Sequence, residues 1–167
     1  LPMKTIQKIL IANRGEIARR IMRTAASMGI ACVAVYEDED AESLYVREAD
    51  ETARLHNGFL DQADILRIAA EHHVDAIHPG YGFLSENADF VQRIEKQGLL
   101  FIGPSSSAMQ RMGEKTSARS EAKAAQVPLL PGEEIEDATL LTEKQRLELV
   151  ERIGLPVVLK AAAGGGG

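Results

Sequence analysis

Short apolar runs alternate with amphipathic stretches over residues 1–113, and this alternation constrains the fold more than any other feature of the sequence. The apolar runs predict strands over 8–13, 31–36, 51–55, 74–78 and 99–103. The stretches between them carry apolar side chains at helical spacing and predict helices over 14–28, 61–73 and 87–98. Strands that alternate with helices through short connections are typical of a parallel sheet covered on both faces. We therefore predict an α/β fold with a Rossmann-like parallel sheet and helices on both faces.

Residue types at the predicted helix ends indicate how the helices begin and stop. Asn13 and Glu16 have the spacing of a capping box, which predicts that Asn13 caps the first helix. Gly29 is suited to the end of that helix. Asp61 is predicted to cap the second helix. The polar stretch 37–50 is expected to be a loop with a short helix.

The pattern changes after Gly103. Helices are predicted over 105–113, 115–126 and 142–154, and a strand over 155–160. These residues contain too little apolar material to close a core of their own. We predict a domain boundary at Gly113, with one domain over residues 1–113 and the opening of a second over residues 114–167.

Charge and composition argue against several classes of partner. The chain has 19 basic and 25 acidic residues and a formal net charge of -6, whereas nucleic-acid-binding proteins usually carry a basic excess or stripe. The apolar runs are too short to span a bilayer, and the N-terminus lacks the long apolar segment of a signal peptide. A single cysteine, Cys32, excludes an intramolecular disulfide and a cysteine-based metal cluster. We expect neither a nucleic-acid nor a membrane partner.

The segments that follow the predicted strands are the candidate sites, because ligands of parallel α/β sheets bind beyond the carboxyl ends of the strands. The first segment, IANRGEIA, has one glycine in place of G-x-G-x-x-G, which argues against NAD or FAD. The stretch HPGYGFLSEN combines two glycines, which permit positive φ, with the aromatic rings of Tyr81 and Phe83. A structural turn capped by Ser85 or Asn87 explains these residues equally well, so both interpretations stay open from the residues alone.

Two lysines stand where a phosphate could bind. Lys160 ends an apolar run and precedes alanines and four glycines, whose backbone N–H groups can surround an anion. The lysine precedes the glycines, unlike the P-loop order, and a flexible linker is the alternative. Lys115 follows Gly113 at a predicted helix start, where a solvated lysine is the ordinary expectation. His72 and His73 have no other ligands clustered nearby, and we expect a solvated helix end there instead of a metal site.

Six motifs, in a fixed order along the chain, resemble the N-terminal part of biotin carboxylase. They are IANRGEIA, ADE, AIHPGYGFLSENADF, FIGPSSSAMQRMGEK, QVPLLPG and RIGLPVVLKAAAGGGG. The ten residues HPGYGFLSEN are highly specific to that family, and the resemblance covers the chain from Lys4 onward. It implies a pre-ATP-grasp domain with a parallel sheet, followed by the beginning of an ATP-grasp domain, in agreement with the fold class predicted from the residues.

The resemblance also implies roles for three groups of residues. The residues expected to bind ATP are Lys115, Lys160, Gly164, Gly165, Gly166 and Gly167. The four glycines are expected to form the start of a lid. The residues expected in the loop near biotin are Tyr81, Gly82, Phe83 and Glu86. Glu86 is expected to hold that loop in shape. Those that match positions facing the second subunit of a homodimer are Arg20 and Arg23.

The family occurs as a separate subunit or as a domain of acyl-CoA, pyruvate and urea carboxylases, and its activity follows as an expectation. It is an ATP-dependent ligase that forms a C–N bond: ATP activates bicarbonate as carboxyphosphate, and carbon dioxide then passes to biotin. Mg²⁺ neutralises the nucleotide phosphates. The implied partners are a biotin carboxyl carrier protein or domain and a carboxyltransferase, in the cytoplasm or in the mitochondrial matrix of a eukaryote.

The residues that carry out the chemistry in this family are expected to lie beyond Gly167. They are a bicarbonate-binding arginine, a general base and metal-binding glutamates. We therefore expect no catalytic residue and no metal ligand among the 167 residues, and no ATP cleavage by them alone. Two alternatives stay open: another ATP-grasp ligase, and a non-catalytic structural or regulatory module with the same fold.

Overall fold

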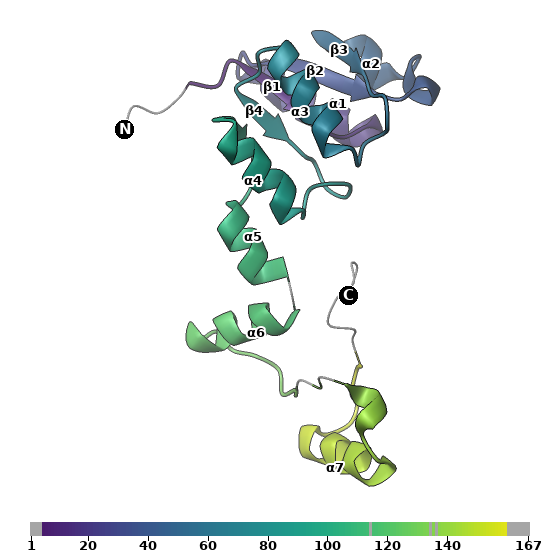
Figure 1. Ribbon diagram of the computed structural model, residues 1–167, viewed down its shortest axis with the longest axis vertical. Helices are drawn as coiled ribbons and strands as arrows, with labels where there is room; N and C mark the ends of the chain where they lie inside the picture. Colours follow the sequence, from purple (N-terminus) through teal and green to yellow (C-terminus); the bar gives the residue numbers. More distant parts are fainter. Residues whose placement is uncertain (1–4, 114, 134, 136, 160–167) are drawn as a thin grey trace. The chain divides into compact units, whose positions relative to one another are not determined.

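The computed structural model describes residues 5–113, 115–133, 135 and 137–159, apart from the side chains of residues 115–117 (Figure 1). The chain forms two compact units, Leu1–Met109 and Gln110–Gly167. They divide shortly before Gly113, the residue at which the sequence predicts the domain boundary.

The first unit is built on a sheet of five parallel strands. The strands are β1 (Lys8–Ile11), β2 (Ala31–Tyr36), β3 (Glu51–Arg54), β4 (Ala76–His78) and β5 (Leu100–Phe101). Their order in the sheet is β3-β2-β1-β4-β5. This confirms the predicted α/β fold with a parallel sheet. The last two strands are shorter than predicted, because fewer of their residues share a regular ladder with a neighbouring strand.

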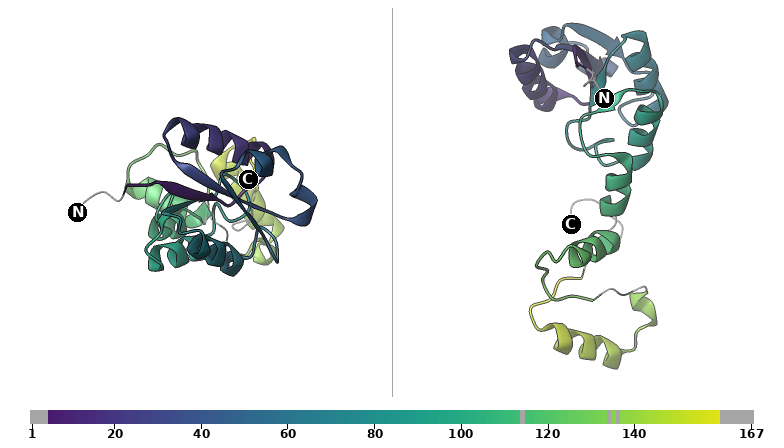
Figure 2. Two further views of the ribbon diagram at one scale, coloured as in Figure 1. Left: turned by 90° about the horizontal axis from the view of Figure 1, so that it is seen from above. Right: turned by 90° about the vertical axis from the view of Figure 1, so that its left-hand side faces the viewer.

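Helices cover both faces of this sheet, as predicted. They are α1 (Gly15–Ser27), α2 (Leu44–Glu48), α3 (Gln62–Glu71) and α4 (Ala88–Lys96), with a 3₁₀ turn, η1, at Asp38–Asp40. In the right-hand view of Figure 2 the purple helix α1 and the blue-green helices α3 and α4 lie on opposite sides of the strands. The short α2 belongs to the same core cluster as α1.

Alternation along the strands divides the core into two layers. Ile9 and Ile11 of β1 belong to the buried cluster that includes Ala18 of α1. Leu10, which lies between them, belongs to the other cluster, together with Ile65 of α3. The strands are therefore apolar on both faces, which explains why they are near-continuous apolar runs in the sequence.

Two of the predicted helix ends are confirmed. The Asp61 carboxylate accepts hydrogen bonds from the backbone N–H groups of Ala63 and Asp64, at 2.9 and 3.1 Å, and so caps α3. Gly29 follows the last residues of α1 with a φ of +71°. Only glycine adopts that conformation without strain, so the residue type and the helix end agree.

The predicted capping box at the start of α1 is wrong. The N-cap residue is Arg14, directly before the helix, and its side chain makes no capping hydrogen bond. The Oδ1 of Asn13 accepts from Arg14 N–H, and its Nδ2 donates to backbone carbonyls of the segment after β4. Tertiary contacts that sequence spacing did not suggest therefore hold this side chain.

The regular elements of the second unit, over the residues that the structure describes, are all helical. Its elements are the end of α5 (Ser106–Gly113), α6 (Lys115–Ala124), a 3₁₀ turn η2 (Ala138–Leu140) and α7 (Glu143–Ile153). Helix α7 begins with a capping box, in which Thr142 accepts from Gln145 N–H while the Gln145 side chain accepts from Thr142 N–H.

The strand predicted over 155–160 is not formed by its described residues, 155–159. A strand requires a neighbour to pair its backbone N–H and C=O groups, and no described strand of this unit lies beside it. Leu159 is 81% exposed, so the apolar run also lacks the packing that would hold it extended. Lys160 and the glycines Gly164–Gly167 lie outside the described residues.

Candidate functional site

The predicted biotin-proximal residues all lie in one loop between β4 and α4. The loop leaves the sheet at His78 and reaches α4 at Asn87, whose side chain caps that helix by accepting from Phe90 N–H. Tyr81 and Phe83, which are separated by Gly82, are 63% and 45% exposed, an unusual degree of exposure for two neighbouring aromatic side chains. The loop therefore presents aromatic surface beyond the carboxyl edge of the sheet.

Glu86 is exposed, and among the described residues its side chain has no hydrogen-bond partner. The loop is held in shape by other groups. One of these is His78, whose Nδ1 accepts a 3.0 Å hydrogen bond from Gly80 N–H. Burial lowers the pKa of His78 below its ordinary value. A neutral imidazole with an unprotonated Nδ1 is what this hydrogen bond requires.

A second group that shapes the loop is Phe59, which follows β3. Its ring stacks on that of Phe83 with centroids 4.8 Å apart and an interplanar angle of 20°. Phe59 is itself 4% exposed and belongs to the core cluster on the α3 and α4 face. The exposed ring of Phe83 is thus anchored to the core through a buried partner, which the sequence analysis did not identify.

The turn after β1 makes the third set of contacts to the loop. Asn13 is fully buried, and its Nδ2 donates to Pro79 O and Tyr81 O, each at 2.8 Å. Glu16, in the first turn of α1, accepts a 2.8 Å hydrogen bond from the Tyr81 hydroxyl. The spacing of Asn13 and Glu16 predicted a helix cap, and neither contact to the loop was predicted. A polar residue directly after a buried strand was the available signal.

Arg14 is held by a separate buried carboxylate on the same side of the sheet. It donates to both oxygens of Asp40, with Nε at 2.6 Å from Oδ2, and Tyr45 O–H donates to Oδ2 at 3.0 Å. The bond from Arg14 lowers the pKa of Asp40, while burial raises the pKa of Tyr45. This network fixes the start of α1, from which Asn13 and Glu16 reach the loop.

Arg20 and Arg23, the predicted dimer-facing residues, are exposed on α1. Arg19, directly before Arg20 in the sequence, differs, because its guanidinium makes two hydrogen bonds of 2.7 Å to the carboxylate of Glu48 in α2. Arg20 and Arg23 are therefore available to a partner, whereas Arg19 is engaged in joining α1 to α2.

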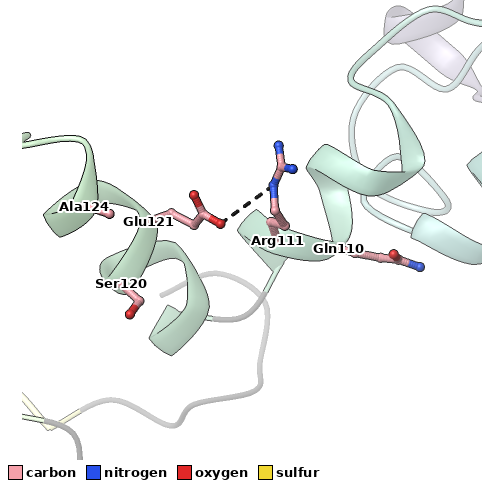
Figure 3. Close-up of a pocket in the computed structure, with 5 residues that line it drawn as sticks. All are labelled: Gln110, Arg111, Ser120, Glu121 and Ala124. Carbon is pink, nitrogen blue, oxygen red and sulfur yellow. Dashed lines mark ion pairs between the residues drawn. The ribbon is translucent and has the colours of Figure 1, made fainter.

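The predicted nucleotide-binding residues belong to the second unit. Lys115 is the first residue of α6, and Lys160 and Gly164–Gly167 fall outside the residues that the structure describes. A hollow of about 540 Å³ is lined by residues of α5 and α6, the helix that Lys115 begins (Figure 3). Its lining residues are Gln110, Arg111, Ser120, Glu121 and Ala124, and Arg111 Nε lies 3.8 Å from Glu121 Oε1. None of the predicted site residues lines it.

Two further kinds of feature are absent from the described ranges. No group of three or more His, Cys, Asp and Glu side chains is placed there to hold a metal ion. No helix in that part of the chain has the length and apolar character needed to cross a membrane. His72, at the end of α3, instead lies 2.6 Å through its Nδ1 from Glu51 Oε2.

Two family models match the chain. The model described as the N-terminal domain of biotin carboxylase matches residues 5–109. The model described as the ATP-binding domain of the carbamoyl-phosphate synthase L chain matches residues 114–167. The first match covers nearly all of the unit that carries the parallel sheet.

Proteins of known activity align with the whole chain. The alpha subunit of methylcrotonoyl-CoA carboxylase from Glycine max is 50% identical over 167 residues, which cover 97% of this chain and 22% of that protein. The biotin carboxylase of Halalkalibacterium halodurans is 46% identical, with 96% and 36% covered. Human mitochondrial pyruvate carboxylase is 43% identical, with 100% and 14% covered. The chain therefore spans between 14% and 36% of the length of these relatives.

A solved structure matches both units. It is the biotin carboxylase domain dimer of 2-oxoglutarate carboxylase from Hydrogenobacter thermophilus, in complex with MgADP, ADP and bicarbonate. The TM-score is 0.87 at 37% sequence identity, with 98% of this chain and 36% of that chain covered. The family model, the aligned relatives and this structural match agree, and the chain belongs to the family of biotin carboxylase N-terminal domains.

Proposed function

We propose that this chain is the N-terminal part of an enzyme that uses ATP and bicarbonate to carboxylate biotin held on a carrier. The observation that carries the proposal is the match to a biotin carboxylase domain crystallised with MgADP and bicarbonate, which covers 98% of this chain. In the proposed reaction ATP activates bicarbonate as carboxyphosphate, and carbon dioxide passes from it to N1 of biotin. The chain supplies binding and positioning groups.

The loop His78–Asn87 is proposed to lie against the ureido ring of biotin. The residues present fit a flat, polar ring: Tyr81 offers an exposed aromatic face. No heavy atom lies within 4 Å of the position that a side chain on Gly82 would occupy, so the backbone there is accessible. Phe83 adds an apolar surface that is anchored on Phe59. Glu86 has an exposed carboxylate beside these groups.

The nucleotide is proposed to bind to the second unit. Lys115 and Lys160 would provide two positive charges for the phosphates, and the glycines Gly164–Gly167 would provide backbone N–H donors in a lid. A charged donor on a phosphate oxygen is stronger than a neutral one, so the lysines would contribute most of this affinity. When bound, ATP with Mg²⁺ supplies the phosphoryl group that activates bicarbonate.

The proposed partners follow from the reaction. A carrier protein or domain must bring biotin to the loop, and a carboxyltransferase must remove the carboxyl group from it. Arg20 and Arg23 are proposed to face a second subunit, which their exposure on α1 permits. The location is proposed to be the cytoplasm in a bacterium or the mitochondrial matrix in a eukaryote, because mitochondrial and bacterial proteins are both among the relatives.

The proposal is tested with the longer protein that contains this chain, supplied with MgATP, radiolabelled bicarbonate and free biotin. The expected result is ADP release that requires bicarbonate, together with acid-labile label that appears only when biotin is present. The 167-residue chain assayed alone is the matched comparison and should release no ADP. ADP release that depends on ammonia or an amino acid would indicate another ATP-grasp ligase, and the absence of any release would indicate a non-catalytic module.

A further inference from the structure

The side chain of Asn13 occupies the position where a doubly wound sheet usually receives its ligand. The strand order β3-β2-β1-β4-β5 changes direction between β1 and β4. In such sheets the crevice beyond the carboxyl ends of those two strands is the common binding position. Asn13 follows β1 and is 0% exposed, and its amide reaches the segment that follows β4. An internal side chain therefore bridges the crevice.

The hydrogen bonds of Asn13 fix the orientation of its amide. Nδ2 uses both of its N–H groups, one on Pro79 O and one on Tyr81 O, each at 2.8 Å. Oδ1 accepts from Arg14 N–H at 2.9 Å. The reversed amide would place its oxygen against two carbonyl oxygens and its N–H groups against another donor. The side chain thus bridges two carbonyls that flank Gly80.

The segment that Asn13 bridges has a backbone conformation that is costly by itself. Gly80, Gly82 and Phe83 have φ values of +63°, +73° and +44°. Phe83 is not a glycine, and L-residues are strained in this region. Conformations of this kind persist where surrounding contacts determine them. The contacts made to this segment include the Asn13 bridge, the Gly80 hydrogen bond to His78 and the Phe59 ring.

Glu16 controls the exposed end of the same segment. Its Oε1 accepts a 2.8 Å hydrogen bond from the Tyr81 hydroxyl, across 65 residues of sequence. The Tyr81 side chain is 63% exposed, so packing does little to fix its ring. The Glu16 carboxylate therefore restricts the direction in which the ring points.

We propose that Asn13 and Glu16 are positioning residues that hold the segment 78–83 in its biotin-binding conformation: Asn13 clamps the backbone on both sides of Gly80, and Glu16 orients the Tyr81 ring. This role for the turn after β1 rests on the proposed function of the loop. If only a fraction of molecules holds the loop in the biotin-binding conformation, the apparent affinity for biotin equals the intrinsic affinity multiplied by that fraction. Loss of the clamp should therefore weaken the binding of biotin while leaving that of ATP unchanged.

The first test is Asn13→Asp in the longer protein, because aspartate has the same shape but removes both donors. The KM for free biotin should rise at least about fivefold, since one buried and one part-buried carbonyl lose their partner. The KM for ATP should stay at the wild-type value. Hydrogen exchange of the peptide that contains 78–83 should become faster. Glu51→Ala, which breaks the Lys8–Glu51–His72 contacts at the opposite edge of the sheet, is the control for a general loss of stability.

The second test uses an exposed position, where substitution does not threaten folding. Glu16→Ala should raise the KM for biotin about two- to fivefold, because it removes one hydrogen bond from a solvated group. Glu16→Gln keeps an acceptor oxygen for the Tyr81 hydroxyl, so its KM should lie much closer to that of wild type. Combining Glu16→Ala with Tyr81→Phe should add nothing to the effect of either change.

Unchanged hydrogen exchange over 78–83 in Asn13→Asp would overturn the clamp. Faster exchange with an unchanged KM for biotin would overturn its link to biotin binding. Equal effects of Glu16→Ala and Glu16→Gln would overturn the role of the Tyr81 hydrogen bond. A wild-type protein that does not carboxylate biotin would refute the proposed function instead, and the exchange experiment would still decide whether Asn13 holds the loop.

Discussion

The ring of Phe83 stacks on the ring of Phe59, with centroids 4.8 Å apart and planes inclined at 20°. One ring belongs to the loop after β4 and the other to the segment after β3, the strand at the far edge of the sheet. Phe83 shields the buried Phe59 while remaining 45% exposed itself. The pair is therefore a structural link between the core and the surface proposed to meet biotin.

This link should appear as a coupling energy in a double-mutant cycle. Phe59→Ala should lower the free energy of unfolding by about 3–5 kcal/mol, because it empties a buried site. Phe83→Ala should lower it by about 1–2 kcal/mol. The double variant should be less destabilised than the sum by about 0.5–1.5 kcal/mol, the contribution expected for a stacked pair. Urea denaturation followed by circular dichroism measures all three values. Exposed Leu60, substituted by alanine, is the control, and strict additivity would contradict the coupling.

Gly80 and Gly82 form a matched pair for testing the close approach of Asn13. Both have positive φ, so alanine is strained at either position. A Cβ on Gly80 would lie 2.6 Å from Asn13 Nδ2 and 2.7 Å from Ile17 Cγ2, whereas one on Gly82 would meet nothing within 4 Å. Gly82→Ala should cost about 1–2 kcal/mol of unfolding free energy. Gly80→Ala should cost at least about 1–3 kcal/mol more, because it also forces packed atoms apart. Equal losses of unfolding free energy in the two variants would show that the atoms around Gly80 move aside without any loss of stability.

Asp40 should contribute to the pH dependence of stability. The hydrogen bond from Arg14 lowers its pKa below the ordinary value of 3.8. A carboxyl group with a depressed folded-state pKa binds its proton more readily in the unfolded chain. Its contribution is therefore present above pH 3.8 and is lost as the pH falls through the folded-state pKa.

Asp40→Asn should accordingly lower the unfolding free energy near neutral pH by about 1–3 kcal/mol and flatten its decline between about pH 5 and pH 2. Urea denaturation at a series of pH values provides the measurement. Asp38→Asn is the control, because Asp38 also bonds an arginine, Arg54, but is largely exposed. Its effect should be clearly smaller than that of Asp40→Asn, because solvent screens an exposed ion pair. If both variants lower the unfolding free energy equally, the burial of Asp40 does not strengthen its ion pair with Arg14.

Lys160→Ala in the longer protein should raise the KM for ATP at least about tenfold, because it removes a charge-assisted contact to phosphate. The KM for biotin, measured in the same assays, should change little, since the biotin-proximal loop belongs to the first unit. Lys160→Arg keeps the positive charge, so its KM for ATP should rise less than that of the alanine variant. An unchanged KM for ATP in the alanine variant would refute the role proposed for this lysine.

Local patterns in the sequence were sufficient for most of the first unit. The apolar runs placed all five strands, and Asp61 and Gly29 marked helix ends correctly, because each of these signals acts over a few residues. The aromatic loop could also be found, since Tyr81 and Phe83 are unusual between two glycines and a helix. The run over 155–159 was misjudged because strand formation depends on a neighbour that sequence spacing does not reveal.

The sequence by itself determined the parallel α/β fold, the division of its apolar residues between two faces, and the loop that faces the proposed ligand. Only the tertiary structure decided what holds that loop. Local spacing predicts that Asn13 caps a helix, whereas in the structure its Nδ2 donates to two carbonyls that lie 66 and 68 residues away. Hydrogen bonds act over about 3 Å, so the partner of a buried amide depends on which segments the completed fold brings beside it.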